Sequence, residues 1–177
     1  MDLCEYTPTV KNLIKTEVER FGKLNPDVTV SCAALYCDPQ NGWIFLNFDS
    51  LENTQHFLEE WSDVDDDSWV GRDDNGLFNN SCPDYDYFEF ARIDFDEWVD
   101  EIESEPVITV SGLGEEHRID LEEGGDEELN RVVLQWLKGI VQDLEDAGTF
   151  SVIQRASTFR LGIQFLDSEC EAFWISE

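Results

Sequence analysis

Basic residues are scarce in this sequence. Its 177 residues include only 11 Lys and Arg against 41 Asp and Glu, which gives a formal net charge of −30. Nucleic acids and anionic membranes are polyanions that proteins hold mainly through Lys and Arg. The acid excess therefore argues against direct binding to nucleic acid or to a membrane, and it favours a positively charged macromolecular partner.

Other absences narrow the class of protein further. No run of about 18 apolar residues is present, so no membrane-spanning helix is expected. The first residues, Met1 to Glu5, lack the basic start and apolar stretch of a signal peptide. The five cysteines are odd in number and have no CxxC spacing, which is typical of reduced thiols in the cytoplasm. We therefore expect a cytoplasmic protein.

Residues typical of catalytic and metal centres are also few. His56 and His117 are the only histidines, and neither has a Ser or Cys nearby in the sequence that would indicate a catalytic triad. The stretch Asp63–Asp74 is rich in the oxygen ligands that calcium prefers. Placing Gly71 or Gly76 at the sixth position of an EF-hand loop, however, leaves unsuitable residues at the other ligand positions. We expect no cofactor and no dedicated metal site, and weak divalent-cation binding by this stretch stays open.

Apolar residues, by contrast, are plentiful enough to build a core. They make up 41% of the chain and include 12 Phe, 6 Trp and 4 Tyr, which excludes a disordered acidic tail. No internal repeat or linker divides the sequence. We expect one α+β domain over residues 1–177, with a small, mostly antiparallel sheet packed against three to four helices.

Hydrophobic periodicity places these elements along the chain. A helix is expected from a Thr7–Pro8 start to Gly22, followed by a β-hairpin at residues 28–36 and 43–48 and a second helix that ends at Trp61. Residues 62–83 are expected to form an acidic loop and residues 84–90 an acidic strand, followed by a helix capped by Asp94. A short strand at 107–110 and an acidic connection at 111–125 lead to the clearest helix, 129–144, and the last segment, 151–175, predicts two or three strands.

The negative charge is concentrated in the middle of the chain. The segment Asp49–Glu128 carries 28 acids and three bases, a net charge of −25, whereas the other 97 residues carry −5. Salt adaptation would coat the whole surface, so this asymmetry favours a local binding face, with general solubility and salt adaptation as alternatives. Acids alternate with aromatic residues there, so carboxylates can meet Lys and Arg while rings supply apolar anchors. The candidate partner-binding residues are Asp63, Asp65, Asp66, Asp67, Trp69, Asp73, Asp74, Asp84, Tyr85, Asp86, Tyr87 and Glu89.

The order of these features resembles that of a known class of bacterial proteins. The features are an amphipathic first helix, a hairpin with Ala33-Ala34-Leu35-Tyr36 and Gly42-Trp43, a helix that opens at Asn53-Thr54, and tryptophans at 61, 69 and 136. This layout is similar to that of the acidic immunity proteins that are encoded beside polymorphic toxins. The resemblance implies a non-enzymatic protein that binds a cognate toxin, often a nuclease with a basic cleft.

Three functions are compatible with these observations. The favoured one is an inhibitor that neutralises a basic partner, as an immunity protein blocks a toxin. A second is a DNA mimic that occupies the surface of a DNA-binding protein, because spaced carboxylates can imitate the phosphates of a duplex. The third is a carboxylate-dependent hydrolase whose catalytic pair cannot be singled out among so many acids.

Overall fold

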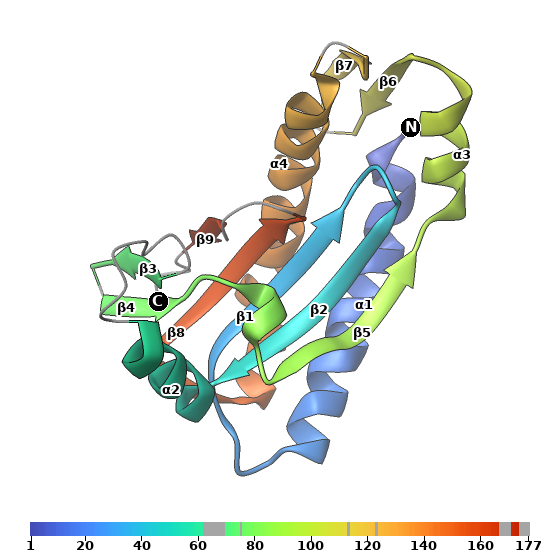
Figure 1. The fold of residues 1–177 in the computed structure, drawn as a ribbon. Coiled ribbons are helices and arrows are strands. Elements are labelled where there is room, and N and C mark those ends of the chain that lie inside the picture. The colour runs from blue at the N-terminus through green and yellow to red at the C-terminus, as the bar shows by residue number, and fades with distance from the viewer. Residues whose placement is uncertain (62–69, 75, 113, 123, 167–170, 174–177) are drawn as a thin grey trace.

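The computed structural model of this chain describes residues 1–61, 70–74, 76–112, 114–122, 124–166 and 171–173. Its centre is a five-stranded sheet in the order β5-β2-β1-β8-β9 (Figure 1). The strands are β1 (Thr29–Asp38), β2 (Trp43–Ser50), β5 (Tyr87–Asp94), β8 (Gln154–Phe165) and β9 (Glu171–Phe173). Only β1 and β8 pair in parallel, and the other three pairings are antiparallel. The expected α+β fold with a mostly antiparallel sheet is confirmed.

Two long helices, α1 (Leu3–Leu24) and α4 (Gly125–Asp146), cover one side of the sheet (Figure 1). The apolar stripe predicted for α4 is buried, including Leu129, Val133 and Leu137. These side chains pack in one core with the residues of β1, β2 and β8 that face the helices. Burying such stripes against a sheet is the main source of stability for an α+β domain.

The first helix begins earlier than the sequence indicated. Its cap is Asp2, whose carboxylate accepts a hydrogen bond from the Cys4 backbone N–H at 2.9 Å. Pro8 therefore lies inside the helix, where it leaves one helical hydrogen bond unmade. Thr7, expected as the cap, instead accepts a hydrogen bond from the indole N–H of Trp136 at 2.8 Å and so links α1 to α4.

The other side of the sheet is the outer face, and the described elements that cover it lie toward one end. The covering elements are α2 (Leu51–Trp61), β3 (Val70–Asp73), β4 (Gly76–Asn79) and the short 3-10 helix η1 (Cys82–Asp84) (Figure 1). The expectation of an irregular loop over 62–83 was wrong in its second half, because β3 and β4 pair as a small antiparallel hairpin. The strand expected from residue 84 begins at Tyr87, because η1 takes up the preceding residues.

A second small hairpin lies at the end of the sheet near the start of α4 (Figure 1). It consists of β6 (Val107–Ser111) and β7 (Glu116–Asp120), and α3 (Asp96–Ser104) precedes it. The acidic connection expected over 111–125 therefore contains a strand, whose Ile119 is buried. Asp94 does not cap α3; Phe95 holds that position, and Asp94 pairs with Arg92. The 3-10 helix η2 (Thr149–Val152) leads into β8. None of the described helices is long and apolar enough to cross a membrane.

Candidate functional site

The candidate partner-binding residues fall into two groups. Asp63, Asp65, Asp66, Asp67 and Trp69 lie outside the residues that the structure describes. The other seven, Asp73, Asp74, Asp84, Tyr85, Asp86, Tyr87 and Glu89, are described, and they occupy markedly different environments. Asp74, Asp84 and Glu89 are exposed, as a residue that contacts a partner must be.

Asp73 is engaged within the protein. Its two carboxylate oxygens accept hydrogen bonds from Nε and Nη2 of Arg160, both at 2.8 Å. The Arg160 side chain is only 2% exposed and also lies over the ring of Phe78. A buried guanidinium needs a carboxylate to balance its charge, so Asp73 stabilises the packing of the β3–β4 hairpin on β8. The carboxylate of Asp73 is therefore already paired within the protein, and its contact with a partner stays a prediction.

The two tyrosines of the acidic strand are less available than the sequence suggested. Tyr85 is 4% exposed, and its hydroxyl donates to Sγ of Cys32 at 3.1 Å. It packs beneath η1 as a core residue, so it cannot serve as an exposed anchor. Tyr87 is partly buried, with its ring edge-on to Phe21 at 4.9 Å between centroids. Burial raises the pKa of Tyr87, and the charge of Asp86 raises it further.

A buried polar network lies where β2 passes into α2. The Asp49 side chain has no solvent exposure. One carboxylate oxygen accepts from the Asn53 amide at 2.6 Å and the other accepts from the Thr54 hydroxyl. Burial raises the pKa of Asp49 to about 6 against the lowering effect of these hydrogen bonds, and the nearby charge of Asp86 adds to the rise. No local pattern in the sequence distinguishes Asp49 from the exposed acids around it.

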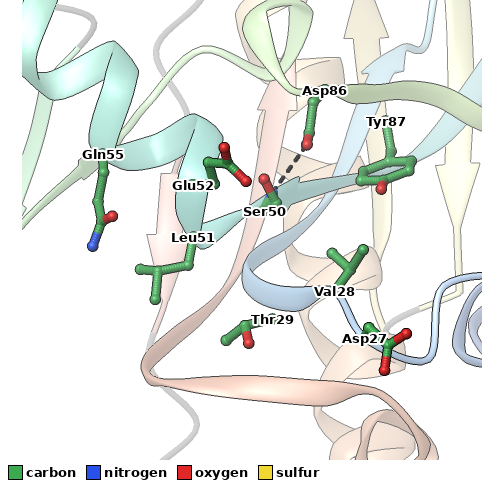
Figure 2. Close-up of a pocket in the computed structure, with 9 residues that line it drawn as sticks. All are labelled: Asp27, Val28, Thr29, Ser50, Leu51, Glu52, Gln55, Asp86 and Tyr87. Atoms are coloured by element: carbon green, nitrogen blue, oxygen red, sulfur yellow. Dashed lines mark hydrogen bonds between the residues drawn. The ribbon is translucent and has the colours of Figure 1, made fainter.

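Asp86 lies beside this network at the edge of a pocket. Its carboxylate accepts from the Ser50 backbone N–H at 2.9 Å (Figure 2). The Ser50 hydroxyl in turn caps α2 by accepting from the Asn53 N–H at 3.1 Å. The pocket has a volume of about 350 Å³. It is lined by Asp27, Val28, Thr29, Ser50, Leu51, Glu52, Gln55, Asp86 and Tyr87, which come from the turn before β1, from α2 and from the start of β5 (Figure 2).

The chemistry of this pocket favours a cation. Asp27, Glu52 and Asp86 place three carboxylates on its lining, and no Lys or Arg is among the lining residues. The buried Asp49 is not among the residues that line this pocket. The described part of the chain also has no group of three or more His, Cys, Asp and Glu residues that could hold a metal ion.

The uncovered part of the outer face carries an aromatic cluster. The rings of Trp43 and Phe45 stack at 4.3 Å between centroids, and Phe88 contacts Phe45 at 5.8 Å. Phe88 is 37% exposed and is therefore the exposed ring of the acidic strand. Sequence reasoning missed it because the alternation of acids with aromatic residues in Asp84-Tyr85-Asp86-Tyr87 favoured the two tyrosines.

A β-bulge in β5 explains why Phe88 lies on the outer face. The pairing of β2 with β5 shifts register between Leu46 and Phe48. Within the shift, Glu89 has a φ of +50°, the one positive φ outside glycine in the described chain. Its backbone N–H donates to the side-chain oxygen of the buried Asn47 at 2.7 Å. Bulges of this kind redirect side chains, and here Phe88 lies on the outer face while Phe90 packs against Phe48 on the inner one.

Charge is unevenly distributed over the fold. Among the described acids of the segment 49–128, Asp49 alone is buried, Asp73, Glu101 and Glu128 are partly buried, and the rest are exposed. They lie on α2, η1, β5, α3, the β6–β7 hairpin and the first turn of α4. More than half of the bases lie on α1 and α4: Lys11, Lys15, Arg20, Lys23, Arg131 and Lys138. The acid excess therefore runs from α2 and η1 along β5 to the end of the sheet, where α3 and the β6–β7 hairpin pack with α1 and α4.

The chain matches no family model, and neither a curated protein nor a solved structure is similar to it at a significant level. The case for a function rests on the charges and shapes described above.

Proposed function

We propose that this protein is a non-enzymatic inhibitor that binds and neutralises a basic macromolecule, as an immunity protein covers the basic cleft of a toxin. The observation that carries the proposal is the net charge of −25 within the segment Asp49–Glu128. Complementary charge of this size steers association, raises the association rate and excludes wrong partners.

The arrangement of the acids supports this function over general solubility. A protein that needs only solubility gains from charge anywhere on its surface. Here α1 and α4 carry six of the eleven bases, while the acid excess lies on α2, η1, β5, α3, the β6–β7 hairpin and the start of α4. A local concentration of charge is the pattern expected of a surface that meets a single partner.

The pocket at the start of α2 adds a specific feature. Asp27 and Glu52 have no ion-pair partner within the described part of the chain, and Asp86 uses its carboxylate on the Ser50 N–H. Acids that line one cavity repel one another, and a cationic side chain from a partner would relieve that repulsion. The pocket therefore suits a Lys or Arg that projects from the bound protein.

The test begins with capture of a partner from a cell lysate at low salt, followed by purification of both proteins. Two triple variants are then compared for partner affinity. One neutralises Asp84, Asp96 and Asp100, which are exposed acids of the charged segment. The other neutralises Glu5, Glu19 and Asp146, which are exposed acids of α1 and α4.

We expect the first variant to weaken binding by about tenfold or more and the second to have a much smaller effect, with both variants remaining folded. The affinity of the wild type should fall steeply as salt is raised. Equal effects of the two variants, or an affinity insensitive to salt, would contradict the proposal. If the captured protein binds DNA and DNA competes with the acidic protein, the target is a DNA-binding surface and the protein is a DNA mimic.

A further inference from the structure

The uncovered aromatic cluster on the outer face already holds one arginine. The guanidinium of Arg92 lies over the ring of Phe45 at 5.0 Å from its centroid. It also donates to both carboxylate oxygens of Asp94, at 2.6 to 2.9 Å, and lies 3.6 Å from the carboxylate of Glu89. An aromatic face flanked by two carboxylates is the surrounding in which proteins bind a guanidinium group selectively.

We infer that this cluster is the place where an arginine of the basic partner docks, and that Arg92 occupies it in the free protein. The inference rests on the proposed function, since it needs a basic partner. The site consists of Trp43, Phe45 and Phe88 as the aromatic surface and of Glu89 and Asp94 as the carboxylates.

The contacts that hold Arg92 are exchangeable. The side chains of Arg92, Glu89 and Asp94 are each between 44% and 49% exposed. Exposed ion pairs contribute little to stability because water and salt screen them. An incoming arginine can therefore replace Arg92 at small cost, and the displaced guanidinium stays near enough to the other acids to remain paired.

The β-bulge is the independent sign that this surface is built for a purpose. A left-handed backbone at Glu89 is unfavourable for a residue with a side chain. It is held by the buried Asn47, and its effect is to place Phe88 beside Phe45 with much of the ring exposed. An apolar ring kept at the surface by a strained segment is typical of a contact residue.

The negative charge of the protein determines which kind of partner can bind at this cluster. A second copy of this chain would bring another net charge of −30 to the same face, so self-association is opposed by repulsion. A basic protein segment has the opposite sign, and arginine is favoured over lysine because its planar group both stacks on a ring and pairs with two oxygens.

The test uses two end-blocked peptides, hexa-arginine and hexa-lysine, titrated at about 50 mM salt where surface charges are weakly screened. Affinity is measured by calorimetry, and the indole N–H signal of Trp43 is followed by NMR after assignment with Trp43→Phe. Arg92→Ala is compared with Arg118→Ala, which removes the same charge from an exposed position on β7. Thermal melting confirms that each variant is folded.

Hexa-arginine should bind the wild type several-fold more tightly than hexa-lysine and should shift the Trp43 signal. Arg92→Ala should bind hexa-arginine about tenfold more tightly than Arg118→Ala does, because the site has been vacated. Phe88→Ala should abolish most of the preference for arginine over lysine. These results together would support the inference.

The opposite results separate the two proposals. If both peptides bind in a salt-dependent manner but Arg92→Ala equals Arg118→Ala and the Trp43 signal does not move, the docking site is refuted while the proposed function stands. If neither peptide binds, the proposed function is contradicted as well. Self-association of Arg92→Ala without peptide would show that the cluster serves a second copy, and it would also overturn the inference.

Discussion

Replacing the buried Asp49 by asparagine provides the sharpest test of the structure. The Asp49 carboxylate is fully buried, yet its hydrogen bonds come from the Asn53 and Thr54 side chains and the Asp86 backbone, and within the described residues no base pairs with it. Asparagine has the same shape and no charge. Its oxygen can accept from Asn53, and its amide can donate to the Thr54 hydroxyl, which in turn can donate to Ser31 at 2.6 Å. We therefore expect Asp49→Asn to fold normally.

The expected effect follows from the raised pKa. In the folded protein the pKa of Asp49 is about 6, against 3.8 for an unperturbed aspartate. Between these two pH values the folded state holds a proton on Asp49 that the unfolded state has lost, so the free energy of unfolding falls as the pH rises. A difference of about two pKa units corresponds to about 3 kcal/mol. This contribution is fully present below about pH 4 and is lost above about pH 6.

The measurement is urea unfolding of the wild type and Asp49→Asn at several pH values from 4 to 7. Titration of the other acids is common to both proteins and cancels in the difference. We expect the variant to gain up to about 3 kcal/mol relative to the wild type between pH 4 and pH 7. Glu52→Gln removes an exposed carboxylate at the same end of α2 and serves as the control. Parallel stability curves for wild type and Asp49→Asn would refute the assignment of Asp49 as a buried, protonatable group.

Two further substitutions test the packing around the site. Asp73→Asn leaves the guanidinium of Arg160, which is 2% exposed, without its carboxylate. We therefore expect the free energy of unfolding in urea to fall by about 3 kcal/mol. A decrease as small as that of Asp74→Asn would contradict the buried pair. Gly42→Ala places a side chain at a φ of +62° and a Cβ atom 2.7 Å from the carbonyl oxygen of Phe95. We therefore expect the free energy of unfolding to fall by about 1–3 kcal/mol. An unchanged melting temperature would show that the β1–β2 turn adopts another conformation.

Most helices and the central hairpin could be predicted from the sequence because their signals are local. The apolar stripe of α4 and the alternation in β1 and β2 depend only on residues a few positions apart. The pairing of β8 with β1 could not be predicted, since these strands are parallel and more than a hundred residues apart. No local pattern records which strand a distant strand will join.

The candidate site was harder to predict than the fold, and the reason lies in the difference between a residue type and its surroundings. Asp73 and Asp74 are adjacent and chemically identical, but one holds a buried arginine and the other is exposed. Tyr85 and Phe88 are both aromatic residues of the segment expected to form the acidic strand, but Tyr85 is buried next to η1, whereas the bulge of β5 leaves Phe88 on the outer face. The burial of each residue depends on tertiary contacts, which residue type and local sequence do not record.

The uneven distribution of charge has a partial explanation in the fold itself. The helices α1 and α4 pack side by side, and a strongly acidic pair of helices would repel one another. Ion pairs between or within them, such as Lys11 with Asp143 at 2.6 Å and Arg131 with Glu128 at 2.6 Å, reduce that repulsion. Packing therefore accounts for the bases of the two helices, where six bases stand against nine acids. It does not account for the acids beyond these helices, where Asp27, Glu52 and Asp86 line one pocket and no base does. The acid excess there is a cost to the isolated protein, and a basic partner is the simplest physical reason for keeping it.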